Sequence, residues 1–145
     1  KITDTKFGLN VKIVNPCNIY GADLGDDVFI GPFVEIQKGV KIGARTKIQS
    51  HSFICELVTI GDDCFIGHGV KFVNDLFKLG GPANGDKSLW SSTLIEKNVS
   101  VGTNATILPV KICNNAVIGA GAVVVNDIDR PGVYVGNPAR LIREI

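Results

Sequence analysis

The stretch from Leu24 to Asp75 decides the fold, because it reads in blocks of six as LGDDVF, IGPFVE, IQKGVK, IGARTK, IQSHSF, ICELVT, IGDDCF, IGHGVK and FVND. An aliphatic or aromatic residue opens every block, and the fifth place is small or β-branched. A helix repeats about every 3.6 residues and a strand every second residue, so neither produces an unbroken period of six. A repeating hexapeptide predicts a parallel β-helix.

Each block is expected to form one short strand and one corner, and three blocks close a triangular coil. Residues 18 apart then lie above one another, as Leu24, Ile42 and Ile60 do on one face. Successive coils pair as parallel strands about 4.8 Å apart, and the aliphatic ladders fill the core. The second place is often glycine, which we expect to relieve crowding and to adopt backbone conformations that other residues resist.

The chain is expected to be one domain spanning residues 1–145, built only from β-strands. It should contain about six triangular coils, one long loop excursion over residues 76–93 and a C-terminal cap over residues 128–145. The excursion is rich in glycine and fits no block of six. Long loops on a rigid scaffold are disproportionately functional.

Two steps of the repeat are one residue short. Leu24 follows Ile19 after five residues, and Ile112 follows Ile107 after five. We expect each shortened step to be absorbed at a corner of the coil. The N-terminal coil should therefore belong to the solenoid despite its irregular spacing.

Composition narrows the function classes. The net charge is +1 and no run of Lys or Arg occurs, so the chain lacks the electrostatic footprint of a nucleic-acid-binding protein. No apolar stretch approaches the roughly 20 residues needed to span a bilayer. The four cysteines show no CxxC spacing, and we expect them to be reduced in a cytoplasmic protein.

Corner positions follow from the same spacing. The third residue of a block lies at a corner and points outward. Glu56 and Asn74 both hold this place and are 18 apart, so they should be stacked neighbours at one corner. Ser50 and His68 have the same relation at a different corner. Within one chain His68 and Asn74 should then lie a triangle edge apart, so that they share a site only across a subunit interface.

The repeat, the segment VGTNATILPVKICNNAVIGAGAVV (residues 101–124) and VGNPARLI (residues 135–142) together resemble the left-handed β-helix acyltransferases that use acyl-CoA. The segment GHGVKFVND (residues 67–75), followed by a loop containing Trp90, most resembles the N-acetyltransferases acting on nucleotide-linked 3-amino sugars. The resemblance covers nearly the whole chain. It implies the left hand of the coil, which the period of six does not reveal.

The resemblance also implies the partners. The donor would be acetyl-CoA, with no metal, and the acceptor a dTDP- or UDP-linked 3-amino sugar used in cell-surface polysaccharide biosynthesis, such as that of lipopolysaccharide. The protein would be a cytoplasmic homotrimer with acetyl-CoA and sugar held between neighbouring subunits. No nucleic acid and no membrane would take part.

Three residues are candidates for the chemistry. Asn74 would orient the amine through its side-chain carbonyl, a role that the resemblance places on the segment Phe72-Val73-Asn74. Glu56 would accept the proton or fix the amine. His68 would do either, or bind CoA or the sugar nucleotide, although a solvated corner histidine is an equally good interpretation. The leaving CoA sulfur is the alternative proton acceptor in such enzymes.

Asp75, His51 and Trp90 are candidates for substrate binding, each with a plain structural alternative. Asp75, like Asn74, would also serve simply to cap the entry to the loop. His51 adjoins Ser50 and is most simply a solvated residue. Trp90 would stack on a nucleotide base or pack the loop.

The candidates for CoA binding are small residues of the resumed repeat and two residues of the GNPAR element. The pantetheine arm runs along the solenoid wall in such enzymes and needs small residues where it passes. Arg140 with Pro138 would contact the phosphates or the adenine. Coil geometry alone would also account for the glycines. The full set is Gly102, Thr103, Gly119, Ala120, Pro138 and Arg140.

Two alternative functions remain, and a third lacks the metal ligands that it needs. A sugar O-acetyltransferase of the same fold would need a histidine as base on a hydroxyl. A non-catalytic scaffold would share the repeat, since fold alone does not determine function. A zinc carbonic-anhydrase-like trimer needs three histidines per chain, and only His51 and His68 are present.

Overall fold

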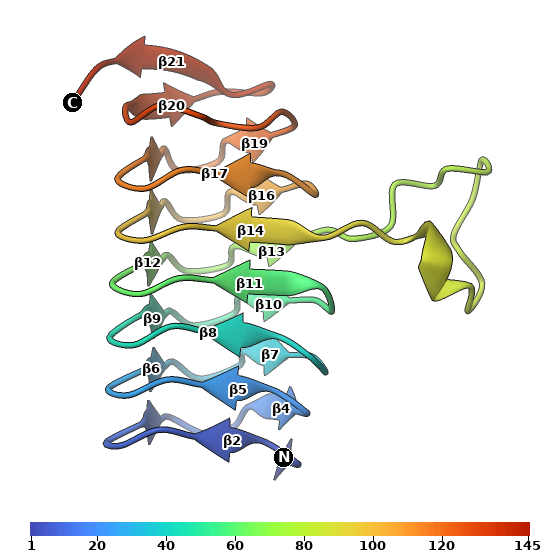
Figure 1. Ribbon diagram of the computed structural model, residues 1–145, viewed down its shortest axis with the longest axis vertical. Coiled ribbons are helices and arrows are strands. Elements are labelled where there is room, and N and C mark those ends of the chain that lie inside the picture. Colours follow the sequence, from blue (N-terminus) through green and yellow to red (C-terminus); the bar gives the residue numbers. More distant parts are fainter.

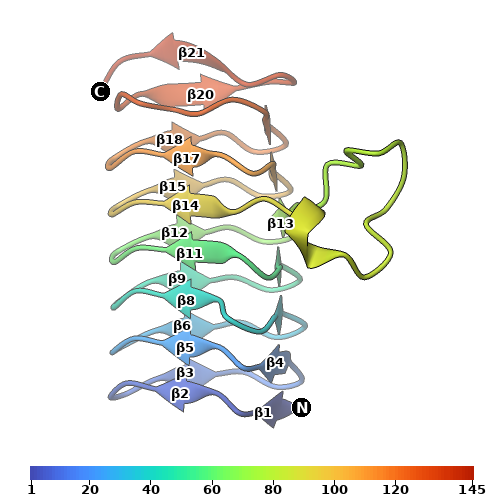
Figure 2. The same cartoon turned by 45° about the vertical axis from the view of Figure 1, so that its right-hand side comes forward.

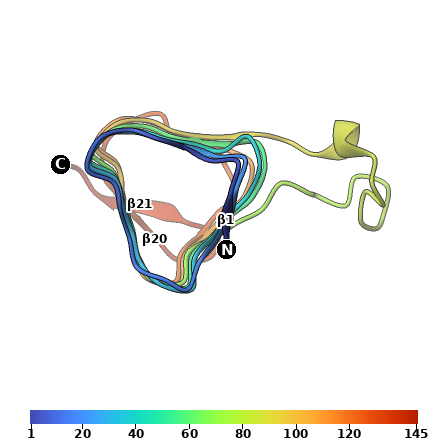
Figure 3. The same cartoon turned by 90° about the horizontal axis from the view of Figure 1, so that it is seen from below.

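The opening residue of each block becomes the inward residue of a strand two to four residues long, and the strands stack into a triangular solenoid (Figures 1 and 2). The computed structural model describes residues 1–145. Figure 3 shows the three sides of the triangle along the solenoid axis, with the excursion projecting from one corner. The fold is the predicted left-handed parallel β-helix. No helix in the structure is long and apolar enough to cross a bilayer.

Three sheets form the sides of the triangle, and their strands are parallel apart from the last one. The first sheet contains β1 (Ile2–Thr3), β4 (Asn18–Tyr20), β7 (Glu35–Ile36), β10 (Phe53–Ile54), β13 (Lys71–Phe72), β16 (Thr106–Ile107) and β19 (Val123–Val124). The second sheet contains β2 (Lys6–Phe7), β5 (Asp23–Leu24), β8 (Lys41–Ile42), β11 (Val58–Ile60), β14 (Thr93–Ile95) and β17 (Lys111–Ile112). The third sheet contains β3 (Lys12–Ile13), β6 (Phe29–Ile30), β9 (Lys47–Ile48), β12 (Phe65–Ile66), β15 (Ser100–Val101), β18 (Val117–Ile118), β20 (Val133–Val135) and β21 (Arg140–Arg143).

The solenoid has about seven turns, one more than the sequence predicted, because the first sheet contains seven strands. The additional coil begins at β1, where Ile2 pairs with Ile19. The predicted irregular N-terminal coil is therefore part of the solenoid. At the other end β21 pairs antiparallel with β20. The cap is thus a β-strand that reverses the chain direction.

All departures from regular spacing lie at the corner between the first and second sheets. The shortened steps Ile19–Leu24 and Ile107–Ile112 both lie there, and so does the excursion between β13 and β14. β14 begins at Thr93, which is buried and pairs with Val58, so the excursion ends one residue earlier than predicted. We call this corner the loop corner. One corner of the triangle therefore carries the sequence variation while the other two keep the repeat.

The aliphatic ladders form one continuous core of 31 buried residues. Ile36, Ile54 and Phe72 are stacked behind the first sheet and are at most 2% exposed. Burying such a side chain contributes about 1.5–3 kcal/mol each relative to leaving it in water. Cys64 is buried at an inward small position, as predicted, and all four cysteines are free thiols.

The second-place glycines are required by crowding. A Cβ on Gly25 would lie 2.8 Å from the backbone nitrogen of Ala44 in the next coil. The expectation that these glycines adopt unusual backbone conformations is wrong, since none of them has a positive φ. That conformation belongs to the fourth place of the block, as at Asp27 (φ 57°) and Asp63 (φ 57°). Aspartate and asparagine tolerate it better than most residues.

Candidate functional site

Asn74 and Glu56 are stacked at the loop corner, as the spacing predicted. The backbone oxygen of Glu56 accepts a hydrogen bond of 3.1 Å from Asn74 Nδ2. Only the NH₂ end of an amide can donate to a carbonyl oxygen, so this contact fixes the orientation of the Asn74 side chain. Its Oδ1 accepts no hydrogen bond within the chain and remains available to an external donor.

Asp75 closes the base of the excursion. Its carboxylate accepts the backbone N–H of Phe77 at 3.0 Å and of Ala83 at 2.8 Å. These two hydrogen bonds hold the pKa of Asp75 below its usual value, since they favour the charged form. Its backbone also pairs with that of Trp90 as an isolated antiparallel bridge. The plain structural interpretation, a residue that caps the loop entry, is thus realised in the structure.

Trp90 lies in the returning limb of the excursion and lines a pocket of about 390 Å³ with Asn74 and Asp75. Residues at the end of the first sheet also line this pocket, among them Phe72 and Cys55. Burial raises the pKa of the Cys55 thiol to about 12, so this thiol is neutral near pH 7. The pocket therefore combines mostly apolar lining residues with Asn74, whose side-chain oxygen has no partner within the chain.

Lys87 connects the excursion to Glu56. It begins the short 3-10 helix η1 (Lys87–Leu89), which the Asp86 side chain caps. Lys87 Nζ lies 3.0 and 3.1 Å from the two carboxylate oxygens of Glu56 and 5.5 Å from the centre of the Trp90 ring. Sequence reasoning did not find Lys87, because nothing in the repeat marks a lysine inside the excursion as facing the solenoid.

Below Glu56 a polar network continues along the same corner. Gln37 Oε1 accepts the backbone N–H of Glu56 at 3.1 Å, and Gln37 Nε2 donates to Glu35 at 2.9 Å. Burial, together with the carboxylates of Glu35 and Glu56, raises the pKa of Tyr20. Sequence reasoning did not single out these residues, although their spacing from Glu56 would have placed them at this corner.

The corner between the third and first sheets carries both histidines, and we call it the histidine corner. Ser50 Oγ and His68 Nδ1 lie 2.9 Å apart, which confirms their predicted stacking. The ladder continues through Thr103 and Ala120 as predicted, since β12, β15 and β18 pair in register. His51 lies against Phe33, with ring centres 4.9 Å apart, and its backbone oxygen accepts Lys71 Nζ.

The two corners are separated within one chain by the width of the first sheet (Figure 3). Asn74, Asp75, Glu56 and Trp90 gather at the loop corner, whereas His68 lies at the histidine corner with His51. The structure therefore brings the predicted site residues together in two groups. A single chain does not unite them.

The predicted CoA residues lie at the histidine corner and the C-terminal cap. Thr103 and Ala120 are exposed there. Gly102 is required by coil stacking, because a Cβ would lie 2.5 Å from the backbone nitrogen of Ala120. Gly119 is likewise crowded by Val135 of the cap. The glycines thus satisfy coil geometry and at the same time keep the wall of this corner free of bulky side chains.

Pro138 and Arg140 lie in and just after the turn between β20 and β21, and both are exposed. Arg140 makes no ion pair, and its guanidinium contacts only the backbone oxygen of Ala139, at 3.3 Å. Its charge is therefore available at the C-terminal end of the solenoid.

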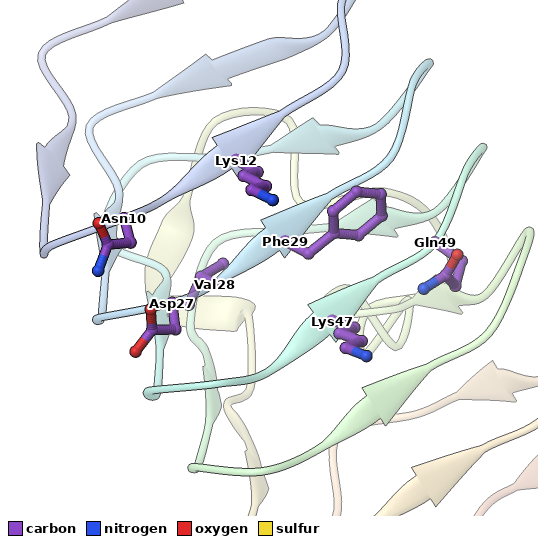
Figure 4. A pocket seen from close by; sticks show the side chains of 7 residues that line it. All are labelled: Asn10, Lys12, Asp27, Val28, Phe29, Lys47 and Gln49. Carbon is purple, nitrogen blue, oxygen red and sulfur yellow. The ribbon is translucent and has the colours of Figure 1, made fainter.

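The largest pocket, of about 760 Å³, lies elsewhere (Figure 4). It lies on the outer face of the third sheet in the N-terminal coils, where Lys12, Phe29 and Lys47 follow one another on paired strands. None of the predicted site residues lines it. No group of three or more His, Cys, Asp or Glu side chains that could hold a metal ion is present in the chain.

Comparison with known proteins identifies the repeat. The family model described as bacterial transferase hexapeptide (six repeats) matches residues 21–56. A second model, the hexapeptide repeat of succinyl-transferase, matches residues 57–70 and 93–125. Together the two matches cover more than half of the chain, and the gap in the second one contains the excursion.

Curated relatives include the bifunctional protein GlmU of Carboxydothermus hydrogenoformans, 34% identical over 158 residues, which cover 99% of this chain and 34% of the relative. GlmU of Thermotoga petrophila is 29% identical over 152 residues with the same two coverages. The chain thus spans about a third of the length of these relatives.

Solved structures include AntD, an N-acyltransferase from Bacillus cereus in complex with dTDP and coenzyme A, with a TM-score of 0.84 and 24% identity over 97% of this chain and 83% of that one. Perosamine N-acetyltransferase from Caulobacter crescentus, in complex with CoA and GDP-perosamine, has a TM-score of 0.79 and 21% identity over 95% and 59%. A maltose O-acetyltransferase from Clostridium difficile has a TM-score of 0.66 and 23% identity over 97% and 69%. At these identities the likeness establishes the fold.

Proposed function

Because the chain belongs to the bacterial transferase hexapeptide-repeat family, we propose that it is an acetyl-CoA-dependent N-acetyltransferase acting on the amino group of a nucleotide-linked 3-amino sugar. One observation carries the proposal. Asn74 donates to Glu56 through Nδ2, its Oδ1 has no partner within the chain, and it lines a pocket together with Asp75 and Trp90. An oxygen that can only accept is suited to an N–H donor of the acceptor amine.

The similar structures support this choice of substrates. AntD was solved with dTDP and coenzyme A, and the perosamine enzyme with CoA and GDP-perosamine. Both names describe acyl transfer to nitrogen. The nucleotide that carries the acceptor sugar of the present protein is proposed to be dTDP or UDP. Trp90 lines the acceptor pocket and would contact the sugar or the base.

Each site residue has a separate role in the proposed reaction. Asn74 Oδ1 accepts an N–H of the acceptor amine and so directs the nitrogen lone pair. The Glu56 carboxylate takes the proton that an ammonium must lose before it can attack. Acetyl-CoA supplies the thioester carbonyl to which the nitrogen bonds, and the sulfur leaves with the second surplus proton when the carbon–sulfur bond breaks. Thr103 and Ala120 leave the wall of the histidine corner open to the pantetheine arm, and Arg140 is available to its phosphates.

A complete site requires a second subunit in this proposal. Asn74 and His68 lie at different corners of one chain, so a homotrimer with sites at its interfaces would place His68 of the partner subunit against the loop corner. We place the reaction in the cytoplasm, where acetyl-CoA and nucleotide sugars are available. The product would serve cell-surface polysaccharide synthesis, such as that of lipopolysaccharide.

An O-acetyltransferase is the second candidate. The observation that favours it is the contact between Ser50 Oγ and His68 Nδ1, because a partner on Nδ1 orients the ring and leaves Nε2 for a substrate hydroxyl. The maltose O-acetyltransferase shares the fold.

A thiol-release assay with acetyl-CoA separates these candidates. The acceptor panel contains dTDP- and UDP-linked 3-amino-3,6-dideoxyhexoses and 3-amino uronic acids, each matched with the sugar that carries a hydroxyl at the same carbon. Turnover with amines and none with hydroxyls supports the proposal. Turnover with hydroxyls alone supports the O-acetyltransferase. No turnover, together with no acetyl-CoA binding by calorimetry, would leave a non-catalytic scaffold.

A further inference from the structure

Lys87 presents a primary ammonium group to Glu56 and Trp90. Its Nζ lies 3.0 and 3.1 Å from the two Glu56 oxygens and 5.5 Å from the centre of the indole ring. No other hydrogen bond of this nitrogen is present in the structure. A carboxylate and an aromatic face together form a cation site that suits an ammonium of this kind.

One of these two groups lines the acceptor pocket, and the other is stacked on a residue that lines it. Glu56 is stacked directly on Asn74, and Trp90 lines the pocket with Asn74. The protonated amine of a sugar and the end of a lysine side chain are the same chemical group. An acceptor amine that approaches Asn74 therefore meets Glu56 and Trp90 where Lys87 lies.

We infer that Glu56 and Trp90 form an ammonium subsite which Lys87 fills from within the chain, so that an amine acceptor binds by displacing Lys87. The inference rests on the proposed function for the identity of the acceptor, and it adds how the acceptor gains access. A hydroxyl group is neutral and cannot replace the positive charge of the Lys87 ammonium, so the subsite selects amine acceptors. Lys87 is thus a specificity-determining residue that excludes neutral sugars.

Displacement is physically reasonable because the contact is weak and accessible. The Lys87 side chain is 59% exposed, and an exposed ion pair contributes little. The excursion projects from the solenoid, and η1 contains no buried residue (Figures 1 and 3).

The test uses Trp90 as its own reporter, since it is the only tryptophan of the chain. Ethylammonium chloride is titrated into the full chain, with sodium chloride at equal ionic strength as the reference. In Lys87→Met the ethylammonium concentration at the midpoint of the Trp90 emission change should be about three- to tenfold lower than in the natural chain. This is the factor expected from removing a competing exposed ion pair and cation–π contact. Lys87→Arg, which keeps the charge, should behave like the natural chain.

Lys97→Met is the matched control. Lys97 makes an exposed ion pair with Asp62 at 3.9 Å, between the second and third sheets and away from the loop corner. This variant removes the same charge and should leave the midpoint unchanged. An unchanged or higher midpoint in Lys87→Met, or no ethylammonium response in that variant, overturns the ammonium subsite.

Turnover separates this inference from the proposed function. With a 3-amino sugar nucleotide, Lys87→Met should lower KM for the acceptor and leave KM for acetyl-CoA unchanged. Tighter ethylammonium binding by Lys87→Met without acetyl transfer to any amine would retain the subsite and refute the N-acetyltransferase. Acetyl transfer with a raised acceptor KM in Lys87→Met would retain the enzyme and refute the displacement.

Discussion

The side-chain nitrogen of Asn74 donates to the backbone oxygen of Glu56 at 3.1 Å, across one step of the solenoid. This contact joins two residues that are 18 apart in the sequence and fixes which end of the Asn74 amide faces outward. It also stacks Glu56 on Asn74, which lines the acceptor pocket where the excursion meets the coil. The chemistry proposed for the loop corner depends on this pairing.

Asn74→Ala should lower kcat by about 10- to 100-fold, the effect of losing one hydrogen bond to a group that becomes charged during the reaction. Asn74→Asp restores an acceptor oxygen and should recover part of the rate. Steady-state kinetics with the best acceptor measures both. Asn126→Ala, an exposed asparagine outside the site, is the control. Full activity in Asn74→Ala would remove Asn74 from the mechanism.

Mixing inactive subunits tests whether the two corners meet across an interface. Chains carrying His68→Ala and chains carrying Asn74→Ala should each be impaired, because each damages one half of every site. Unfolding and refolding them together at equal amounts should restore about a quarter of the natural activity, since that share of interfaces in a random trimer pairs two intact corners. Sedimentation confirms the trimer. Activity that stays at the level of the single variants would show that the corners do not cooperate.

The Asp75 carboxylate should make the base of the excursion sensitive to acid. Its pKa is lowered in the folded chain by the backbone N–H groups of Ala83 and Phe77, so the stabilisation is fully present above the unfolded pKa of about 3.9. It is lost as the pH falls through the lower folded value. Trp90 emission should therefore change below about pH 4, before the far-UV circular dichroism of the solenoid does.

Asp75→Ala should show the same Trp90 emission change already at neutral pH. Asp127→Ala is the control, because Asp127 also accepts one backbone N–H, that of Lys111, but at a distance from Trp90 along the corner. If Asp75→Ala leaves the emission unchanged at neutral pH, Asp75 does not hold the base of the excursion.

Coil stacking should make Gly25 intolerant of a side chain. Gly25→Ala places a Cβ 2.8 Å from the backbone of Ala44, and the coils must shift apart, at a cost of about 1–3 kcal/mol of unfolding free energy. Gly81→Ala in the excursion meets nothing within 4 Å and should change the unfolding free energy by less than about 1 kcal/mol. Urea denaturation measures both. Equal effects would contradict crowding as the reason for the second-place glycine.

The period of six determined the fold, because each residue in a regular coil contacts the residue one turn away. Spacing alone therefore placed Ile36 under Ile54, Asn74 on Glu56 and His68 on Ser50. It also located the excursion to within one residue at Thr93.

The sequence could not place residues outside the repeat, since no periodic contact constrains them. Lys87 reaches Glu56 across 31 residues only because the excursion folds back onto the loop corner. The additional coil at Ile2 and the antiparallel cap at β21 likewise depend on pairing at the ends of the solenoid, where the repeat has decayed. Local periodicity thus determined the scaffold and the corner ladders. Only the tertiary structure decided which side chain of the excursion contacts the corner ladders.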